Sequence, residues 1–201
     1  MAITNYTELQ TAVANWLGRG DLTSRITEAI ALAEAKINRK LRTLDMVTKN
    51  ATFSITGEYV AVPTSFGGAK TFYLNTNPVR HLEPLSDEYL NTAFNSSGVP
   101  LGYVVQGTNF RFGPVPSQTY SSTLVYWLKV PALTGSATTN WMITSHPDAY
   151  LYLSCAEMCA LAREWDAAQG YEQQGYSILQ EIVDQSKKDR IGDGSLMTRP
   201  M

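Results

Sequence analysis

The chain has 201 residues, of which 44% are hydrophobic and 17% charged, and its formal net charge is -2. This composition is that of a globular protein with a sizeable core, and it excludes a disordered chain rich in charge. The near-neutral balance gives no global positive field that would favour nucleic acid or an anionic membrane.

No apolar run approaches the ~20 residues that a membrane-spanning helix needs. The N-terminal stretch MAITNYTELQ lacks the basic-then-apolar pattern of a signal peptide. We therefore expect a protein that is made in the cytoplasm and stays there or is assembled from there. The two cysteines, Cys155 and Cys159, are too few for a disulfide framework, and their spacing places them on one face of a helix as small core residues.

Two amphipathic helices are predicted near the N-terminus. The first covers residues 7–17, where Thr7 and Gln10 have the spacing of a capping box. The second covers residues 22–44, and its C-terminal half is crowded with basic residues: Lys36, Arg39, Lys40 and Arg42. Positive charge there suits the negative end of the helix dipole. The alternative interpretation is a cluster that faces DNA or an acidic partner.

Residues 46–139 have the pattern of β structure. The stretches VTKNATFSI and YVAVP alternate apolar and polar residues around Thr56-Gly57-Glu58, which predicts a hairpin. A turn is predicted at Gly107-Thr108-Asn109, and a short helical turn begins near Ser86. Residues 135–139 are interpreted as a polar linker that leads back to helix.

Two further helices are predicted near the C-terminus. Ser145 is the expected cap of the first, and Pro147 suits its first turn. Apolar residues wrap most of this helix as far as Arg163, so we expect it to be buried on several sides. After a break at Glu164-Trp165-Asp166, the last helix covers about residues 167–190.

These elements predict an α+β fold. The N- and C-terminal helix pairs, residues 1–45 and 140–190, form a four-helix bundle, because the third helix needs several partners and only these helices are available. A mostly antiparallel β region, residues 46–139, is inserted between the pairs. Residues 191–201 form an extended C-terminal tail.

No P-loop, dinucleotide-binding fingerprint or CxxC pair occurs, so we expect no catalytic, cofactor or metal site. The side chains of His146 and Asp148 diverge on a first helical turn, with no nucleophile nearby. The tripeptide Arg19-Gly20-Asp21 is interpreted as a turn followed by a helix cap. A hydrolase that uses Glu157 and Glu164 as paired carboxylates stays open as an enzymatic alternative. Tyr120, Trp141 and Tyr176 are aromatic candidates for an interface.

Several stretches resemble a known family in the same order along the chain. They are YTELQTAVANWLGRGDLTSRI at 6–26, IALAEAKINRKLRTLDM at 30–46, VPLGYVVQGTNFRFGPVP at 99–116 and NWMITSHPDAYLYLSCAEMCALA at 140–162. Over most of its length the chain resembles the head-to-tail adaptor, or connector, proteins of tailed bacteriophages. The combination of IALAEAKINRKLR with NW…HPDAYLY is the most specific part.

The resemblance implies a non-enzymatic virion protein at the head–tail vertex. In that family a ring, typically a dodecamer, lies below the portal, extends the DNA channel and receives the tail. The implied partners are copies of the chain itself, the portal protein, tail or nozzle proteins and passing DNA, with no membrane and no cofactor.

The resemblance also assigns the C-terminal tail to portal binding, through Ile191, Ser195, Leu196, Met197, Thr198, Arg199, Pro200 and Met201. Another virion ring component, such as a tail terminator, is the first alternative. A virion-associated wall hydrolase is the second.

Overall fold

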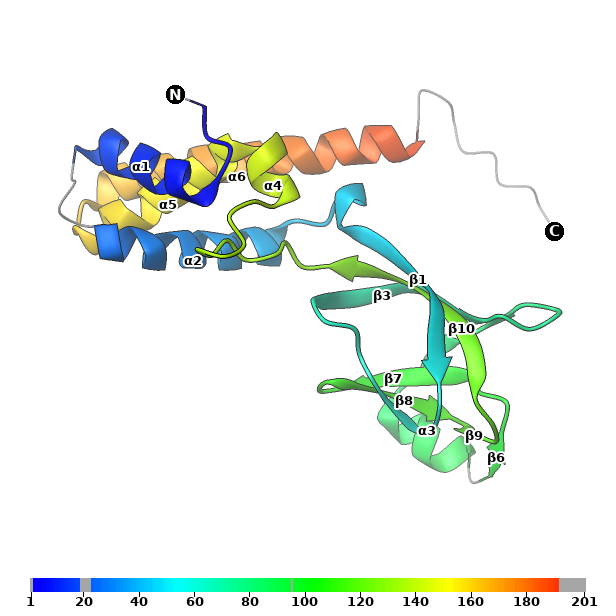
Figure 1. Ribbon diagram of the computed structural model, residues 1–201. Helices are drawn as coiled ribbons and strands as arrows, with labels where there is room; N and C mark the ends of the chain where they lie inside the picture. The colour runs from blue at the N-terminus through cyan, green and yellow to red at the C-terminus, as the bar shows by residue number, and fades with distance from the viewer. Residues whose placement is uncertain (1, 19–22, 95, 192–201) are drawn as a thin grey trace. The chain divides into compact units, whose positions relative to one another are not determined.

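A computed structural model describes residues 2–18, 23–94 and 96–191. The chain divides into two compact units, which are described separately (Figure 1). We call Met1–Asp45 with Val130–Met201 the helical unit, and Met46–Lys129 the β unit. The combination of helices with mostly antiparallel sheets confirms the predicted α+β class.

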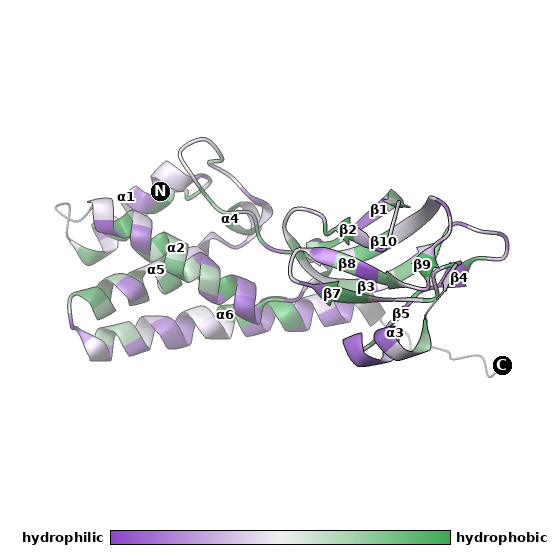
Figure 2. Cartoon of the chain, turned by 90° about the horizontal axis from the view of Figure 1, so that it is seen from below, coloured by the Kyte–Doolittle hydropathy of each residue, from purple (hydrophilic) through white to green (hydrophobic). Residues whose placement is uncertain are grey.

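The helical unit has five α-helices in its described residues: α1 Tyr6–Leu17, α2 Thr23–Lys40, α4 Trp141–Ser145, α5 Pro147–Leu161 and α6 Trp165–Ile191. Helix α5 contacts α1, α2 and α6. Its buried residues are distributed around the helix rather than along one stripe, as expected for a helix covered on several sides. Figure 2 shows the contrast with α6, where hydrophilic and hydrophobic residues alternate along the helix.

Two predicted helix caps are wrong. Helix α1 begins one residue earlier than expected, because the side chain of Asn5 accepts a hydrogen bond from the Glu8 amide at 3.0 Å. At the other site Ser145 is the last residue of α4, and His146 precedes α5 without a side-chain cap. Pro147 does occupy the first turn of α5, as predicted.

The sequence predicts that residues 130–139 belong to the β region. In the structure they belong to the helical unit instead. Asn38 of α2 accepts the Val130 amide proton at 2.7 Å, and Glu34 accepts that of Leu133 at 2.7 Å. The Tyr6 amide donates to the Thr138 carbonyl at 2.8 Å. Because these bonds satisfy the backbone of an irregular segment, the segment packs on the helices without regular structure of its own.

The β unit has two four-stranded sheets, in the orders β1-β10-β3-β4 and β2-β8-β7-β5, and a two-stranded sheet of β6 and β9. Its elements are β1 Val47–Ile55, β2 Tyr59–Ala61, β3 Phe66–Leu74, β4 Arg80–His81, β5 Glu83–Pro84, α3 Asp87–Ala93, β6 Ser97–Gly98, β7 Gly102–Gln106, β8 Asn109–Gly113, β9 Val115–Pro116 and β10 Tyr120–Leu128. All pairings are antiparallel except β5 with β7 and β6 with β9.

The predicted hairpin around Thr56-Gly57-Glu58 is wrong. Strand β1 before it pairs with β10, and strand β2 after it pairs with β8 of the other sheet. The chain therefore changes sheets at this point instead of folding back on itself. The predicted turn at Gly107-Thr108 does join neighbouring strands, β7 and β8, and Gly107 has the positive φ of 58° that such a turn favours.

The core of the β unit is rich in aromatic rings contributed by both four-stranded sheets. Phe110 is fully buried, and its ring centroid lies 5.3 to 5.8 Å from those of Phe53, Phe66, Phe72 and Tyr103. Most of these pairs meet edge to face, the arrangement that the ring quadrupoles favour.

Candidate interaction surface

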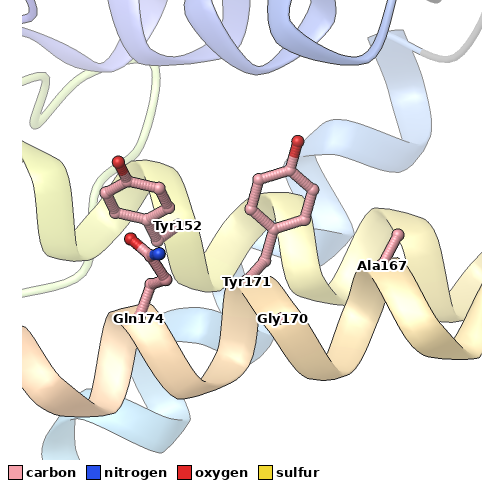
Figure 3. Close-up of a pocket in the computed structure, with 5 residues that line it drawn as sticks. All are labelled: Tyr152, Ala167, Gly170, Tyr171 and Gln174. Atoms are coloured by element: carbon pink, nitrogen blue, oxygen red, sulfur yellow. The ribbon is translucent and has the colours of Figure 1, made fainter.

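A hollow of about 380 Å³ lies on the helical unit, lined by Tyr152 of α5 and by residues of α6 (Figure 3). The α6 residues are Ala167, Gly170, Tyr171 and Gln174. Their spacing of three, four and seven residues places them on one stripe of the helix. We call these five residues the aromatic hollow.

Aromatic rings from three helices meet at the hollow. The ring centroid of Trp16 on α1 lies 5.5 Å from that of Tyr152 and 6.4 Å from that of Tyr171. The two tyrosine rings are 6.3 Å apart and project on the same side (Figure 3). Trp16 is still 50% exposed, so the aromatic surface is partly open to solvent. Tyrosine and tryptophan combine a large apolar surface with a polar group, which suits a protein interface.

Two glycines of α6 differ in their surroundings. A Cβ on Gly175 would lie 2.6 Å from a methyl carbon of Leu153, so this glycine allows α5 and α6 to pack closely. A Cβ on Gly170 would meet no atom within 4 Å. Glycine in a helix interior costs about 1 kcal/mol relative to alanine, and nothing within the helical unit requires it at residue 170. Its effect is to keep the hollow open.

The other flank of α6 carries a different set of side chains. Trp165, Glu172 and Tyr176 follow a stripe with spacings of seven and four residues. Lys40 of α2 lies over the ring of Tyr176, 5.6 Å from its centroid. At 100° per residue, Trp165 lies about 170° around the helix from the centre of the aromatic hollow. With 66% of its surface exposed, Trp165 is the most exposed large hydrophobic residue in the described part of the chain.

A partly buried ion cluster holds α2, α5 and α6 together. The Lys36 ammonium lies 2.6 Å from a carboxylate oxygen of Glu157 and 2.5 Å from one of Glu172. Partial burial acts to lower the pKa of Lys36, but its hydrogen bonds to both carboxylates outweigh burial and raise it. The hydrogen bond from Lys36 lowers the pKa of Glu172. This cluster covers the side of α5 that lies between α2 and α6.

The four basic residues singled out in the sequence are not equivalent in the structure. Lys36 is engaged with Glu157 and Glu172. Arg42 donates to the carbonyls of Asn38 and Leu41 near the end of α2, at 3.2 and 2.8 Å. Arg39 and Lys40 are exposed. Arg42 is also exposed, so three of the four basic side chains are accessible to a partner, and Lys36 is partly buried.

Several of the residues considered for chemistry are buried or held by a neighbouring charge. Cys155 and Cys159 are free and buried, and burial raises the pKa of the Cys155 thiol to about 12. Glu157 is bound by Lys36, as described. Within residues 2–18, 23–94 and 96–191 no cluster of three or more His, Cys, Asp or Glu side chains could hold a metal ion. In the same ranges no helix is long and apolar enough to cross a membrane.

Several predicted sites lie elsewhere or cannot be placed. Tyr120 is buried in the β-unit core, so its interpretation as an interface residue is wrong. The tail residues after Ile191 and the Arg19-Gly20-Asp21 tripeptide lie outside the described residues. The aromatic hollow was not predicted from the sequence. The available sequence indication was Gly170, a glycine within a predicted amphipathic helix and off its apolar stripe.

Comparison with protein families identifies the class to which this architecture belongs. The model of the SU10 adaptor protein family matches residues 4–199, which is nearly the whole chain. The chain therefore belongs to the SU10 adaptor protein family, and the resemblance to phage head–tail adaptors is confirmed. A search among curated proteins finds no match to this chain.

Proposed function

We propose that the protein is a structural subunit of a phage virion that forms a homo-oligomeric ring between the portal and the tail. In this role the ring extends the DNA channel, and the subunit is made in the host cytoplasm before it joins the virion. The single observation that carries the proposal is the family match over residues 4–199. The exposed aromatic surface on the helical unit supports it, because ring subunits need contacts with more than one neighbour.

Within this proposal, α1, α2, α5 and α6 act together as a four-helix bundle that forms the assembly platform. The packing of α5 against the other three supports this view. The β unit acts as an insertion that supplies further surface for tail or nozzle proteins.

The C-terminal tail, residues 191–201, is proposed as the portal-binding segment, and the basic cluster of Lys36, Arg39, Lys40 and Arg42 as a contact for a partner or passing DNA. Purified protein mixed with its cognate portal is expected to give ring complexes in negative-stain images. Deletion of residues 192–201 is expected to weaken that docking and to leave the thermal stability of the free protein unchanged. Separate portal and protein particles under assembly conditions would contradict the proposed function.

A tail terminator, or another virion ring that does not touch the portal, is a second candidate that the sequence leaves open. Crosslinking from Met197 or Arg199 followed by identification of the partner separates the two. A portal partner favours the adaptor, and a tail-tube partner with no portal peptide favours the terminator.

The wall-hydrolase candidate has less support, because Glu157 is held in an ion pair with Lys36. Replacement of Glu157 or Glu164 by alanine would have to abolish wall hydrolysis for this candidate to stand.

A further inference from the structure

We propose that neighbouring copies of this chain associate head to tail through α6, with Trp165 of one copy inserted into the aromatic hollow of the next. The inference rests on the proposed function, because it assigns a surface to the contact between ring subunits. It follows from the shape, position and charge of the two flanks of α6.

The first argument is the fit between a projecting side chain and a hollow. Trp165 is 66% exposed, although tryptophan gains more than most residues from burial. The aromatic hollow, at about 380 Å³, has room for an indole ring. The hydroxyls of Tyr152 and Tyr171 and the amide of Gln174 offer acceptors for the indole N–H, which is a donor only. Tryptophan in such a setting is the residue type most enriched among interface hot spots.

The second argument is the position of the two features on one helix. Trp165 shares its flank with Glu172 and Tyr176, which contact α2. The hollow lies on the flank that faces α1, where Tyr171 meets Trp16. In such a contact each copy uses one flank of α6 for one neighbour and the opposite flank for the next. The two copies at the ends of a row therefore each keep one unused patch. The contact thus propagates from copy to copy and closes into a ring when the rotation between copies allows.

The third argument is charge complementarity with matched spacing. Lys40 lies over Tyr176, eleven residues after Trp165, or about 16 Å along α6 at 1.5 Å per residue. Glu181 lines the continuation of the hollow with Gly170 and Gln174. Glu181 lies ten to eleven residues after the centre of the hollow, which falls between Gly170 and Tyr171. This separation is also about 16 Å along α6. When Trp165 enters the hollow of a parallel neighbour, Lys40 therefore meets Glu181. Such a pair fixes register between partners.

Paired cysteines test this contact directly. The variant carrying Gln169→Cys and Gln174→Cys is expected to form a ladder of disulfide-linked dimers, trimers and larger species under mild oxidation. Gln169 lies one helical turn after Trp165 on the same flank, and Trp165 itself is kept. A mixture of the two single variants is expected to stop at dimers. Both sites tolerate substitution, since both side chains are exposed. The native thiols are buried.

The matched control carries Gln169→Cys and Gln180→Cys, because Gln180 is exposed on α6 like Gln174 but lies outside the hollow. A ladder no stronger than in this control, both for the free protein and for the protein mixed with portal rings, overturns the proposed contact. Sedimentation velocity supplies a second measurement. Gly170→Leu is expected to weaken self-association at least tenfold by filling the hollow, as is Lys40→Glu. The double variant Lys40→Glu with Glu181→Lys is expected to restore it, and no restoration counts against the register.

The two proposals fail in different ways. A ladder without any binding to the portal supports the contact and contradicts the adaptor function. Ring complexes on the portal that show no ladder support the adaptor function and contradict the contact.

Discussion

Gly175 of α6 lies directly against Leu153 of α5. A Cβ added to Gly175 would come within 2.6 Å of Cδ2 and 2.7 Å of Cγ of Leu153. Leu153 is fully buried, so any shift of its side chain has to be accommodated by the residues around it. The close approach of the two helices therefore depends on the missing side chain at residue 175.

Replacement of Gly175 by alanine is expected to lower the free energy of unfolding by about 1–2 kcal/mol. Overpacking against Leu153 costs about 1–3 kcal/mol, and the better helix propensity of alanine offsets up to about 1 kcal/mol of it. Chemical denaturation of the purified protein measures the difference.

The matched control is Gly170→Ala on the same helix, where a Cβ meets no atom. This variant is expected to raise the free energy of unfolding by up to about 1 kcal/mol through helix propensity alone. An equal gain in both variants would contradict the packing argument.

Replacement of Lys36 by methionine is expected to lower the free energy of unfolding by about 1–3 kcal/mol at neutral pH. The change leaves the carboxylates of Glu157 and Glu172 close together without their shared cation. The cost is smaller than for a fully buried pair, because all three side chains are partly exposed. Arg39→Met, an exposed change on the same helix, is the control and is expected to stay within about 0.5 kcal/mol.

The pH dependence of the Lys36 variant has a defined direction. Because Lys36 lowers the folded-state pKa of Glu172, the stability it confers is present above the unfolded carboxyl pKa and is lost as pH falls through the folded value. The raised pKa of Lys36 means that its own contribution is lost only as pH rises through that folded value. The cost of Lys36→Met should therefore shrink in acid, and an equal cost in acid and at neutral pH would refute the charge argument.

For Glu34 the expected dependence of stability on pH has the opposite sign. Burial raises its pKa, although hydrogen bonds from the Leu133 amide and the Tyr150 hydroxyl act to lower it. The folded protein therefore binds this proton more tightly than the unfolded chain does. As pH rises from the unfolded carboxyl pKa through the folded value, wild-type stability should fall relative to Glu34→Gln.

Denaturation curves of wild type and Glu34→Gln across that range measure the difference. A difference between the two proteins that does not change with pH would show that the carboxyl is not destabilised by burial. The unpaired amide protons of glutamine add an offset, but that offset does not vary with pH.

The sequence predicted the elements that depend on local pattern. The apolar circumference of α5 and the start of α3 next to Ser86 follow from residues within or next to the helix. The turn between β7 and β8 follows from Gly107 in the same way. In these places a few neighbouring residues determine the backbone conformation, so a single sequence is sufficient to predict it.

Features that depend on distant partners were not predictable. The alternation around Thr56-Gly57-Glu58 is the same whether the flanking strands pair with each other or with β10 and β8. The sequence places residues 130–139 in the β region, with residues 135–139 as a polar linker. Asn38 and Glu34, about a hundred residues earlier, instead bind the amides of Val130 and Leu133. The rings of Trp16, Tyr152 and Tyr171, which meet at the aromatic hollow, come from three helices, and no local pattern joins them.

The β unit has a core of its own, and Phe110 is the residue on which that core most depends. Replacement of Phe110 by alanine is expected to cost about 3–5 kcal/mol, because a fully buried ring in contact with four other rings leaves a cavity. Val79→Ala, an exposed position in the same unit, should change stability by less than about 0.5 kcal/mol. Amide hydrogen exchange should show faster exchange in β7, β8 and β10 of the Phe110 variant. Retained protection of those strands would contradict the central place of Phe110 in the core.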